Sequence, residues 1–226
     1  MNLTLFDLDG TLIETDSDHA FGEFLVAIGW VDVEAYQRRN DAFYEDYQAA
    51  RLDLDAYIDF ATSAWRQRPE AEALAARERF MRELMQPALR PRALALVREH
   101  QAAGDLVAIV TATNEFVTRP IAEAFGVTEL IAVELARDHN GAVTGAVRGV
   151  PSFGEGKIVR VEQWLAGQGL RHADFERITF YGDSTNDLPL LEWATHPVAT
   201  NPGPALAVIA RERGWPVLNL FTEEET

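Results

Sequence analysis

The stretch FDLDGTLIET (Phe6–Thr15) places two aspartates, Asp7 and Asp9, directly after the apolar run LTLF. That run predicts a short buried strand ending near Asp7. If the extended path continues through residue 9, both carboxylates point to the same side of the chain. An isolated carboxylate in a mostly buried place costs several kcal/mol or takes up a proton. The pair therefore requires a partner from elsewhere in the chain or from solution.

Strands and helices alternate from about Arg90 onward, and one further strand-like run lies at the start of the chain. The strand-like runs are LTLFDLDG, DLVAIVTAT, ELIAVEL and RITFYGD, followed by the shorter HPVATN and WPVLNL. Apolar runs without clean polar alternation are typical of strands covered on both faces. Helical patterns that end in glycine lie between them, such as RALALVREHQAAG and NEFVTRPIAEAFG. This order predicts an α/β fold with a Rossmann-like, mostly parallel sheet.

The segment between Asp9 and Thr111 is much longer than a crossover between neighbouring parallel strands requires. Most of it has a helical pattern, in the runs HAFGEFLVAIG, VEAYQRRNDAFYEDYQAA, LDAYIDFATSAW and EAEALAARERFMRELM. About four helices can form a small bundle of their own. We therefore expect residues 15–88 to form an inserted helical domain, and residues 1–14 plus 89–226 to form the α/β core.

A small β-hairpin interrupts the alternation after the third predicted strand. Asn140-Gly141 lies between two strand-like runs in ELARDHNGAVTGAVRG. Asn-Gly is the strongest short-range signal for a hairpin turn. We expect this hairpin to be appended to the sheet.

The composition excludes several kinds of site and partner. The chain has 226 residues, 47% of them hydrophobic, and no cysteine, which excludes disulfides, cysteine-ligated metal centres and a thiol nucleophile. The formal net charge of −16 repels nucleic acid and anionic lipid. No apolar run reaches the ~18 residues of a membrane helix. With no secretory signal at the N-terminus, we expect a cytoplasmic protein that binds neither nucleic acid nor membrane.

Ligands bind beyond the carboxyl ends of strands in open parallel sheets, and Asp183 follows such an end in RITFYGD. Asp7, Asp9 and Asp183 converging there would repel one another unless a cation lies among them. A hard divalent ion with oxygen ligands fits, and we expect Mg²⁺, which also takes a ligand from a substrate phosphate. The ion would supply the positive charge that the acidic chain lacks.

Two further groups are suited to phosphate. Thr111 offers a hydroxyl at a strand end, and Ala112, Thr113 and Asn114 lead from it into a helix N-terminus, which favours anions. Lys157 follows FGEG, where two glycines allow close backbone approach, and its ammonium is a point charge.

An aspartate beside Mg²⁺ and phosphate can act as a nucleophile, and a companion carboxylate can protonate the leaving oxygen and then activate water. Each residue also has a simpler interpretation. Asp7 and Asp9 could be turn residues before Gly10, and Lys157 could be a solvated lysine at a helix start. Asp183 and Asp187 could be helix-cap acids.

The stretches FDLDGTL, AIVTAT, GEGK and YGDSTNDLPLL resemble, in this order, the four motifs of the haloacid dehalogenase-like superfamily, and the match spans the whole chain. The helical insert resembles the C1-type cap of its phosphoserine-phosphatase-like branch, subfamily IB. The resemblance implies that Asp7 is the nucleophile and a metal ligand. Asp9 would be the acid/base and bind metal through its backbone carbonyl, and Asp183 would be a further ligand.

The resemblance also implies supporting roles. Thr111, Ala112 and Lys157 would hold the phosphoryl group, with Lys157 screening Asp7 during catalysis. Asn186 would orient the phosphate side, and Asp187 would support the metal.

The insert is expected to choose the substrate. In phosphoserine phosphatases a glutamate and a cap arginine hold the amino acid, and the nearest equivalents in this sequence are Asp16 or Asp18 and Arg51. The arginine-rich motif expected around Arg51 is not matched, and the segment more closely resembles subfamily IB members described as histidinol-phosphate phosphatases. The aromatic residues of the insert are expected mostly in its core, namely Tyr44, Tyr47, Tyr57 and Trp65.

We therefore predict a Mg²⁺-dependent phosphatase that hydrolyses a small phosphorylated metabolite through a phospho-Asp7 intermediate, as a monomer or homodimer. Two alternatives stay open at this point. A phosphotransferase would use the same intermediate with an acceptor other than water. A binding protein would keep the fold without catalysis.

Overall fold

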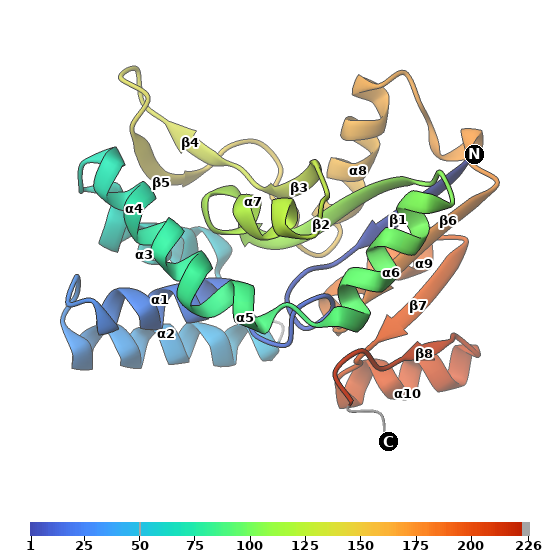
Figure 1. The fold of residues 1–226 in the computed structure, drawn as a ribbon, viewed down its shortest axis with the longest axis horizontal. Helices are drawn as coiled ribbons and strands as arrows, with labels where there is room; N and C mark the ends of the chain where they lie inside the picture. Colours follow the sequence, from blue (N-terminus) through green and yellow to red (C-terminus); the bar gives the residue numbers. More distant parts are fainter. Residues whose placement is uncertain (50, 223–226) are drawn as a thin grey trace.

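The computed structural model describes residues 1–49 and 51–222, and its centre is a six-stranded parallel sheet (Figure 1). The strand order is β3-β2-β1-β6-β7-β8, with every neighbouring pair parallel. The strands are β1 (Asn2–Phe6), β2 (Leu106–Asn114), β3 (Glu129–Val133), β6 (Arg177–Gly182), β7 (His196–Thr200) and β8 (Val217–Leu218). The predicted α/β class is confirmed. Because the order reverses at β1, the carboxyl ends of β1, β2 and β6 lie side by side at the switch point where ligands bind.

Helices cover both faces of this sheet. They are α6 (Pro91–Ala102) and α7 (Glu115–Ala124) on one face, and α8 (Gly156–Gly167), α9 (Leu188–Trp193) and α10 (Pro204–Arg213) on the other. Phe6 packs toward α6 and α7, whereas Leu3 and Leu5 pack toward the second group. Successive side chains of a strand point to opposite faces, so β1 is apolar on both and its residues form a continuous buried run.

The long segment between β1 and β2 is helical, as predicted. It contains α1 (Ser17–Ala27), α2 (Val33–Gln48), α3 (Leu54–Arg66), α4 (Glu70–Phe80), a π-helical turn (Met81–Met85) and α5 (Gln86–Ala88). The first three helices begin at aspartate N-caps, Asp16, Asp32 and Asp53, whose side chains accept backbone N–H groups. In Figure 1 these helices lie together at one end of the sheet. Trp65 of α3 stacks on Phe116 of α7 at 4.0 Å between ring centroids, so the insert packs directly against the core.

The predicted hairpin forms a two-stranded antiparallel sheet of its own, β4 (Leu135–Arg137) and β5 (Val143–Val147). It packs against α3 of the helical insert. Gly145 of β5 has φ +89°, and a Cβ there would lie 1.8 Å from Arg66 Nη1. Arg66 is itself held by Asp59, whose Oδ1 accepts its Nη2–H over 2.6 Å. The hairpin therefore connects the core to the insert through a close contact that only glycine allows.

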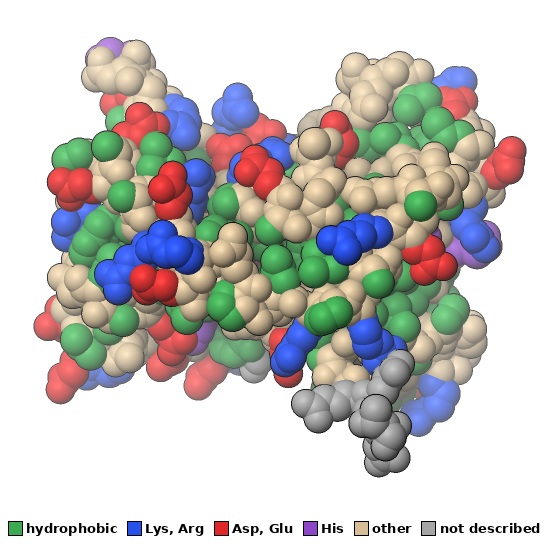
Figure 2. Space-filling model, in the orientation of Figure 1, with side chains coloured by type: hydrophobic (Ala, Val, Ile, Leu, Met, Phe, Trp, Pro, Cys, Tyr) green, Lys and Arg blue, Asp and Glu red, His purple; other side chains and the backbone are tan. Residues whose placement is uncertain are grey.

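The surface carries charges of both signs despite the net charge of −16. Figure 2 shows acidic and basic side chains interspersed on the face of Figure 1. Some of them form pairs along helices, such as Arg79 and Glu83. Within residues 1–49 and 51–222, the helices are too short or too polar to cross a membrane.

We predict that Gly145→Ala destabilises the protein more than Gly141→Ala. Both glycines have positive φ, so each alanine costs about 1 kcal/mol of backbone strain. A Cβ at Gly141 meets nothing within 4 Å, whereas at Gly145 it displaces the Arg66 guanidinium, for a total of about 2–3 kcal/mol. Urea unfolding of both variants measures the difference, and Arg66→Ala is expected to remove it. Equal costs would show that the contact does not constrain the hairpin.

Candidate active site

The turn after β1 brings the predicted residues together at the carboxyl edge of the sheet. Asp7 follows β1, and its N–H donates to the Tyr181 carbonyl of β6 over 2.9 Å. The chain turns at Gly10, where φ is +75° and a Cβ would lie 2.4 Å from Asp183 Oδ2. Because only glycine meets both demands, Gly10 allows the β1 turn to approach Asp183 closely.

Lys157, in the first turn of α8, is the single lysine of the sequence. Its Nζ donates to Asp7 Oδ1 over 2.6 Å and to Asp187 Oδ1 over 2.5 Å, and its side chain is 2% exposed. Burial by itself lowers a lysine pKa, but the carboxylates of Asp187 and Asp7 outweigh burial and raise the pKa of Lys157. The ammonium is therefore charged and held by two carboxylates.

Three carboxylates meet around this ammonium. Asp7, Asp183 and Asp187 each offer one oxygen, and these oxygens lie within 4.8 Å of one another. Burial, followed by the neighbouring Asp187 carboxylate, raises the pKa of Asp7 to about 8 and holds that of Asp183 well above its ordinary value. A single ammonium does not balance three carboxylates. Oxygen donors at this spacing fit a hard divalent cation such as Mg²⁺.

Asp9 has different partners. Its Oδ1 accepts the Ser17 N–H of α1 over 2.7 Å, and its Oδ2 accepts the Thr113 hydroxyl of β2 over 3.0 Å. Burial, followed by the carboxylate of Asp16, raises the pKa of Asp9 to about 6. Asp9 thus lies between the end of β2 and the first turn of the insert, with a pKa suited to gaining and losing a proton near neutral pH.

The residues expected to hold phosphate lie in two places. Thr111 and Ala112 line the same pocket as Asp9, and the Thr111 hydroxyl is 3.4 Å from Asp9 Oδ2. Asn186 is on the wall of a neighbouring hollow together with Asp183. The structure thus places Thr111 and Ala112 in one pocket with Asp7 and Asp9, while Asn186 lines a neighbouring hollow that Asp9 and Asp183 also border.

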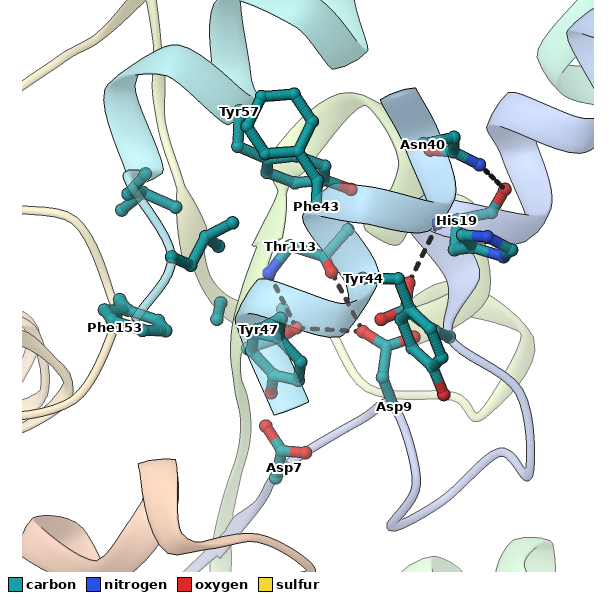
Figure 3. A pocket seen from close by; sticks show the side chains of 15 residues that line it. Asp7, Asp9, His19, Asn40, Phe43, Tyr44, Tyr47, Tyr57, Thr113 and Phe153 are labelled. Atoms are coloured by element: carbon teal, nitrogen blue, oxygen red, sulfur yellow. Dashed lines mark hydrogen bonds between the residues drawn. The ribbon is translucent and has the colours of Figure 1, made fainter. Parts of the chain in front are cut away.

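A pocket opens beside Asp7 and Asp9 beneath the helical insert (Figure 3). The other residues of its wall are Asp16, His19, Asn40, Phe43, Tyr44, Tyr47, Leu52, Leu54, Tyr57, Thr111, Ala112, Thr113 and Phe153. Burial and then the Asp7 carboxylate raise the pKa of Tyr47 well above its ordinary value, in keeping with its place beside Asp7 in Figure 3. The insert and the core form this pocket jointly.

The sequence led us to expect the aromatic residues of the insert mostly in its core, and this expectation is wrong for the three tyrosines. Tyr44, Tyr47 and Tyr57 line the pocket, whereas Trp65 stacks on Phe116 and packs inside the molecule. Helical spacing alone does not separate these cases, because one helix face can pack against a neighbour and still border a cavity.

The three insert residues proposed to contact substrate have different surroundings. Asp16 lines the pocket and caps α1. Asp18 is buried, and its Oδ1 accepts an N–H over 3.0 Å from the side chain of Asn114, the last residue of β2 and the N-cap of α7. Arg51 is outside the pocket wall, where its side chain is 66% exposed and pairs with Asp46 over 2.6 Å.

Sequence reasoning did not single out Thr113 as a partner of Asp9. A signal was present in TAT, because Thr111 and Thr113 are two residues apart and an extended strand turns them to the same face. Ser17 donates through its backbone, so its residue type carried no signal at all.

The fold and this acidic, lysine-centred site define an open α/β protein of the class that binds ligands at the carboxyl ends of its strands. The profile of the haloacid dehalogenase-like hydrolase family matches residues 4–192, and the chain belongs to that family. The predicted class of enzyme, a phosphatase-like hydrolase of this family, is confirmed.

Individual relatives cover nearly all of the chain. A Neisseria meningitidis serogroup C protein named histidinol-phosphatase is 43% identical over 218 residues, covering 96% of this chain and 98% of its own. A Bordetella pertussis Tohama I protein described as of unknown function has a crystal structure with TM-score 0.92 and 48% identity, covering 97% and 99%. A substrate-bound phosphoserine phosphatase shares the fold, with TM-score 0.67 and 18% identity, covering 96% and 91%.

We predict that the protein is less stable at higher pH when divalent metal is removed. The pKa of Asp7 is raised to about 8 and that of Asp183 is also raised, so the folded state holds protons that the unfolded state releases. This contribution to stability is fully present below the ordinary carboxyl pKa and is lost as pH rises through about 8. In EDTA, the thermal midpoint should fall between about pH 6 and pH 9.

Adding Mg²⁺ at the upper pH should raise the midpoint by at least about 3 °C, since 1 kcal/mol corresponds to roughly 2–4 °C in a chain of this size. Asp183→Asn should reduce that gain, whereas Asp55→Asn, an exposed residue of α3, should leave it unchanged. A midpoint in EDTA that rises with pH would contradict this account of the cluster.

Proposed function

We propose that this hydrolase is a Mg²⁺-dependent phosphatase that cleaves a small phosphomonoester through a phospho-Asp7 intermediate. The observation that carries the proposal is the Lys157 ammonium bonded to Asp7 inside a cluster of three carboxylates. A phosphate dianion needs local positive charge in a chain of net charge −16. Asp7, Asp183 and Asp187 would hold Mg²⁺, which when bound supplies the positive charge that Lys157 alone does not provide.

The first step belongs to Asp7. One oxygen of its ionised carboxylate bonds to phosphorus while the ester P–O bond breaks. Lys157 orients that carboxylate through its 2.6 Å contact and, together with the cation that the cluster would hold, favours its ionised form. Asp9 gives its proton to the departing oxygen, so the leaving group departs as an alcohol.

The second step reverses the role of Asp9. Its carboxylate, now ionised, takes a proton from a water molecule whose oxygen attacks phosphorus. The bond between phosphorus and the Asp7 oxygen breaks, inorganic phosphate leaves and the Asp7 carboxylate is regenerated. The Thr113 hydroxyl and the Ser17 N–H orient Asp9 through both steps.

Three residues are proposed to position the phosphoryl group. Thr111 and Ala112 border the pocket at the end of β2, from where a hydroxyl and a backbone N–H can face a phosphate oxygen. Asn186 would act from the other side, beside Asp183.

The relatives support a small phosphorylated metabolite as the substrate. One relative at 43% identity is named a histidinol-phosphatase, and the fold is shared with a phosphoserine phosphatase. We propose histidinol phosphate and phosphoserine as the first substrates to test, and we place the reaction in the cytoplasm.

We also propose that residues 15–88 act as a cap over a core of residues 1–14 and 89–226. Tyr44, Tyr47 and Tyr57 of the insert face the pocket that Asp7 and Asp9 border from the core. Movement of the insert would admit substrate and then exclude water that is not in line for attack.

We predict that the protein releases phosphate from p-nitrophenyl phosphate with Mg²⁺ and not in EDTA. Asp7→Asn keeps the shape of the side chain but removes the nucleophile, so kcat should fall at least about 10³-fold. The assay contains no acceptor other than water, so free phosphate in step with nitrophenol distinguishes hydrolysis from transfer to another acceptor. Mg²⁺-dependent turnover that survived in Asp7→Asn would rule out the covalent route.

Asp9→Asn should slow both steps, with kcat lower by about 10²–10⁴-fold. Nitrophenol leaves readily without protonation, so the second step should suffer more and phosphate should accumulate on the chain. Acid quenching followed by mass spectrometry measures that fraction, and Asp9→Asn combined with Asp7→Asn should abolish it. A variant that loses turnover without trapping phosphate would argue against Asp9 as the base of the second step.

A further inference from the structure

A second hollow lies where the helical insert meets α7 and the β4–β5 hairpin. It has a volume of about 440 Å³, within the usual range for small-molecule sites. Its wall is built from α3, α4 and the link between them, from α7 and from the hairpin, and Figure 1 shows these elements as neighbours. Among the described residues it shares no side chain with the pocket beside Asp7 and Asp9. The two cavities are therefore distinct.

Arginines dominate the polar part of this wall. They are Arg66, Arg68, Arg77, Arg119 and Arg137. The acids of the wall are Glu70 and Glu115. Arg66 is held by Asp59, and Arg68 lies 3.6 Å from Glu72, so these two guanidiniums already have carboxylate partners. In a chain of net charge −16, a wall with more basic than acidic side chains is a local exception that favours an anion.

The other three guanidiniums have no carboxylate partner. Within residues 1–49 and 51–222, no acid lies within 4.0 Å of Arg77, Arg119 or Arg137. Each donates from Nη1 to one backbone carbonyl, over 2.8 to 3.2 Å. Because a guanidinium has five N–H donors, each of the three keeps donors for a ligand.

Arg77 is the least satisfied of the three. Its Nε is buried and has no hydrogen-bond partner among the described residues. Burial lowers the pKa of this guanidinium, and the carboxylates of Glu123 and Glu78 offset that effect only in part. Its Cζ lies 4.9 Å from the centre of the Phe116 ring, which holds the group at the junction of α4 and α7. A buried donor without an acceptor costs free energy, and an anion in the hollow would supply an acceptor to this side chain.

The chemistry of the wall defines the class of ligand. Guanidinium groups pair with carboxylate and phosphate groups through parallel N–H bonds. Three guanidiniums from separate segments are best matched by a molecule that carries at least two such groups. Apolar surface from Leu74, Val143 and Phe116 belongs to the same wall and suits a carbon skeleton between them.

We propose that Arg77, Arg119 and Arg137 form a binding site for a small organic polyanion with two or more carboxylate or phosphate groups, apart from the catalytic pocket. Arg77 belongs to α4 of the insert, whereas Arg119 belongs to α7 and Arg137 to the hairpin. A bound polyanion therefore bridges the insert and the core. The inference goes beyond the phosphatase proposal and does not depend on it.

Calorimetric titration of the metal-free protein tests the site. Metal is removed with a chelating resin, because EDTA is itself a polycarboxylate, and without Mg²⁺ the carboxylates around Asp7 repel anions. At least one of propane-1,2,3-tricarboxylate and pyrophosphate should bind with one equivalent per chain and a Kd below about 1 mM, and the tighter one identifies the preferred group. Acetate, which has a single carboxylate, should bind at least about 10-fold more weakly. Binding should weaken as NaCl rises from about 50 to 300 mM.

Substitutions in the wall locate the anion. Arg77→Gln and Arg119→Gln each remove a half-buried guanidinium, so affinity should fall at least about 10-fold. Arg137→Gln removes an exposed guanidinium and should cost about 3- to 5-fold. Glu70→Gln removes a negative charge from the wall and should strengthen binding about 2- to 3-fold. Arg98→Gln, which removes an exposed charge of α6, is the matched control and should leave affinity unchanged.

Turnover of p-nitrophenyl phosphate separates this site from the catalytic one. Each variant should keep kcat/KM within about 3-fold of the parent, since the two cavities share no wall residue. Circular dichroism and thermal midpoints check that the variants are folded. If Arg77→Gln does not fold, Arg119→Gln and Arg137→Gln decide the question.

The proposal fails if neither probe binds with a Kd below about 1 mM, or if the arginine variants bind as tightly as Arg98→Gln. It also fails if folded arginine variants lose anion affinity and turnover in parallel, because the anion would then occupy the catalytic pocket. Loss of anion affinity with unchanged turnover supports it. If no phosphate ester is hydrolysed but the arginine variants still lose the anion, this site stands and the phosphatase proposal is wrong.

Discussion

One buried ammonium joins the chain segments on which the site depends. Lys157 bonds at once to Asp7 after β1 and to Asp187 after β6, although these residues are far apart in sequence. Leaving the carboxylates without it would cost about 3–5 kcal/mol, the usual effect of breaking a buried ion pair. Every other basic side chain of the sequence, histidines apart, is an arginine. A compact ammonium serves two carboxylates from one atom, which a planar guanidinium does not.

The charge that remains determines what the site can bind. Three carboxylates and one ammonium leave an excess of negative charge, which burial makes expensive. A divalent cation would relieve the excess, and together with Lys157 it would attract a phosphate that the whole chain would repel. Close approach depends on two glycines, since a Cβ at Gly10 would strike Asp183 and one at Gly182 would lie 2.9 Å from the Asp187 Cβ.

The sequence predicted what depends on local pattern. Apolar runs marked each strand of the main sheet, Asn140-Gly141 marked the hairpin, and the convergence of Asp7 with Asp183 followed from strand ends in a parallel sheet. It did not predict what depends on packing between distant segments. The hairpin meets α3 through Gly145, a contact that no local pattern encodes. Arg51 turns outward because Asp46 is within reach, and Asp9 is held by a backbone N–H that has no residue signature.

The start of α1 contacts both Asp9 and the wall of the pocket. Its Ser17 N–H holds Asp9; Asp16, which caps the turn, lines the pocket, and Asp18 is buried behind it. Any movement of α1 therefore displaces the backbone partner of Asp9 and the part of the pocket wall formed by Asp16 together. Asn114 ties this turn to the core, because it caps α7 with its oxygen and donates its amide to Asp18. Because Asp16 lines the pocket and the neighbouring Ser17 holds Asp9, a ligand in contact with Asp16 would also act on the position of Asp9.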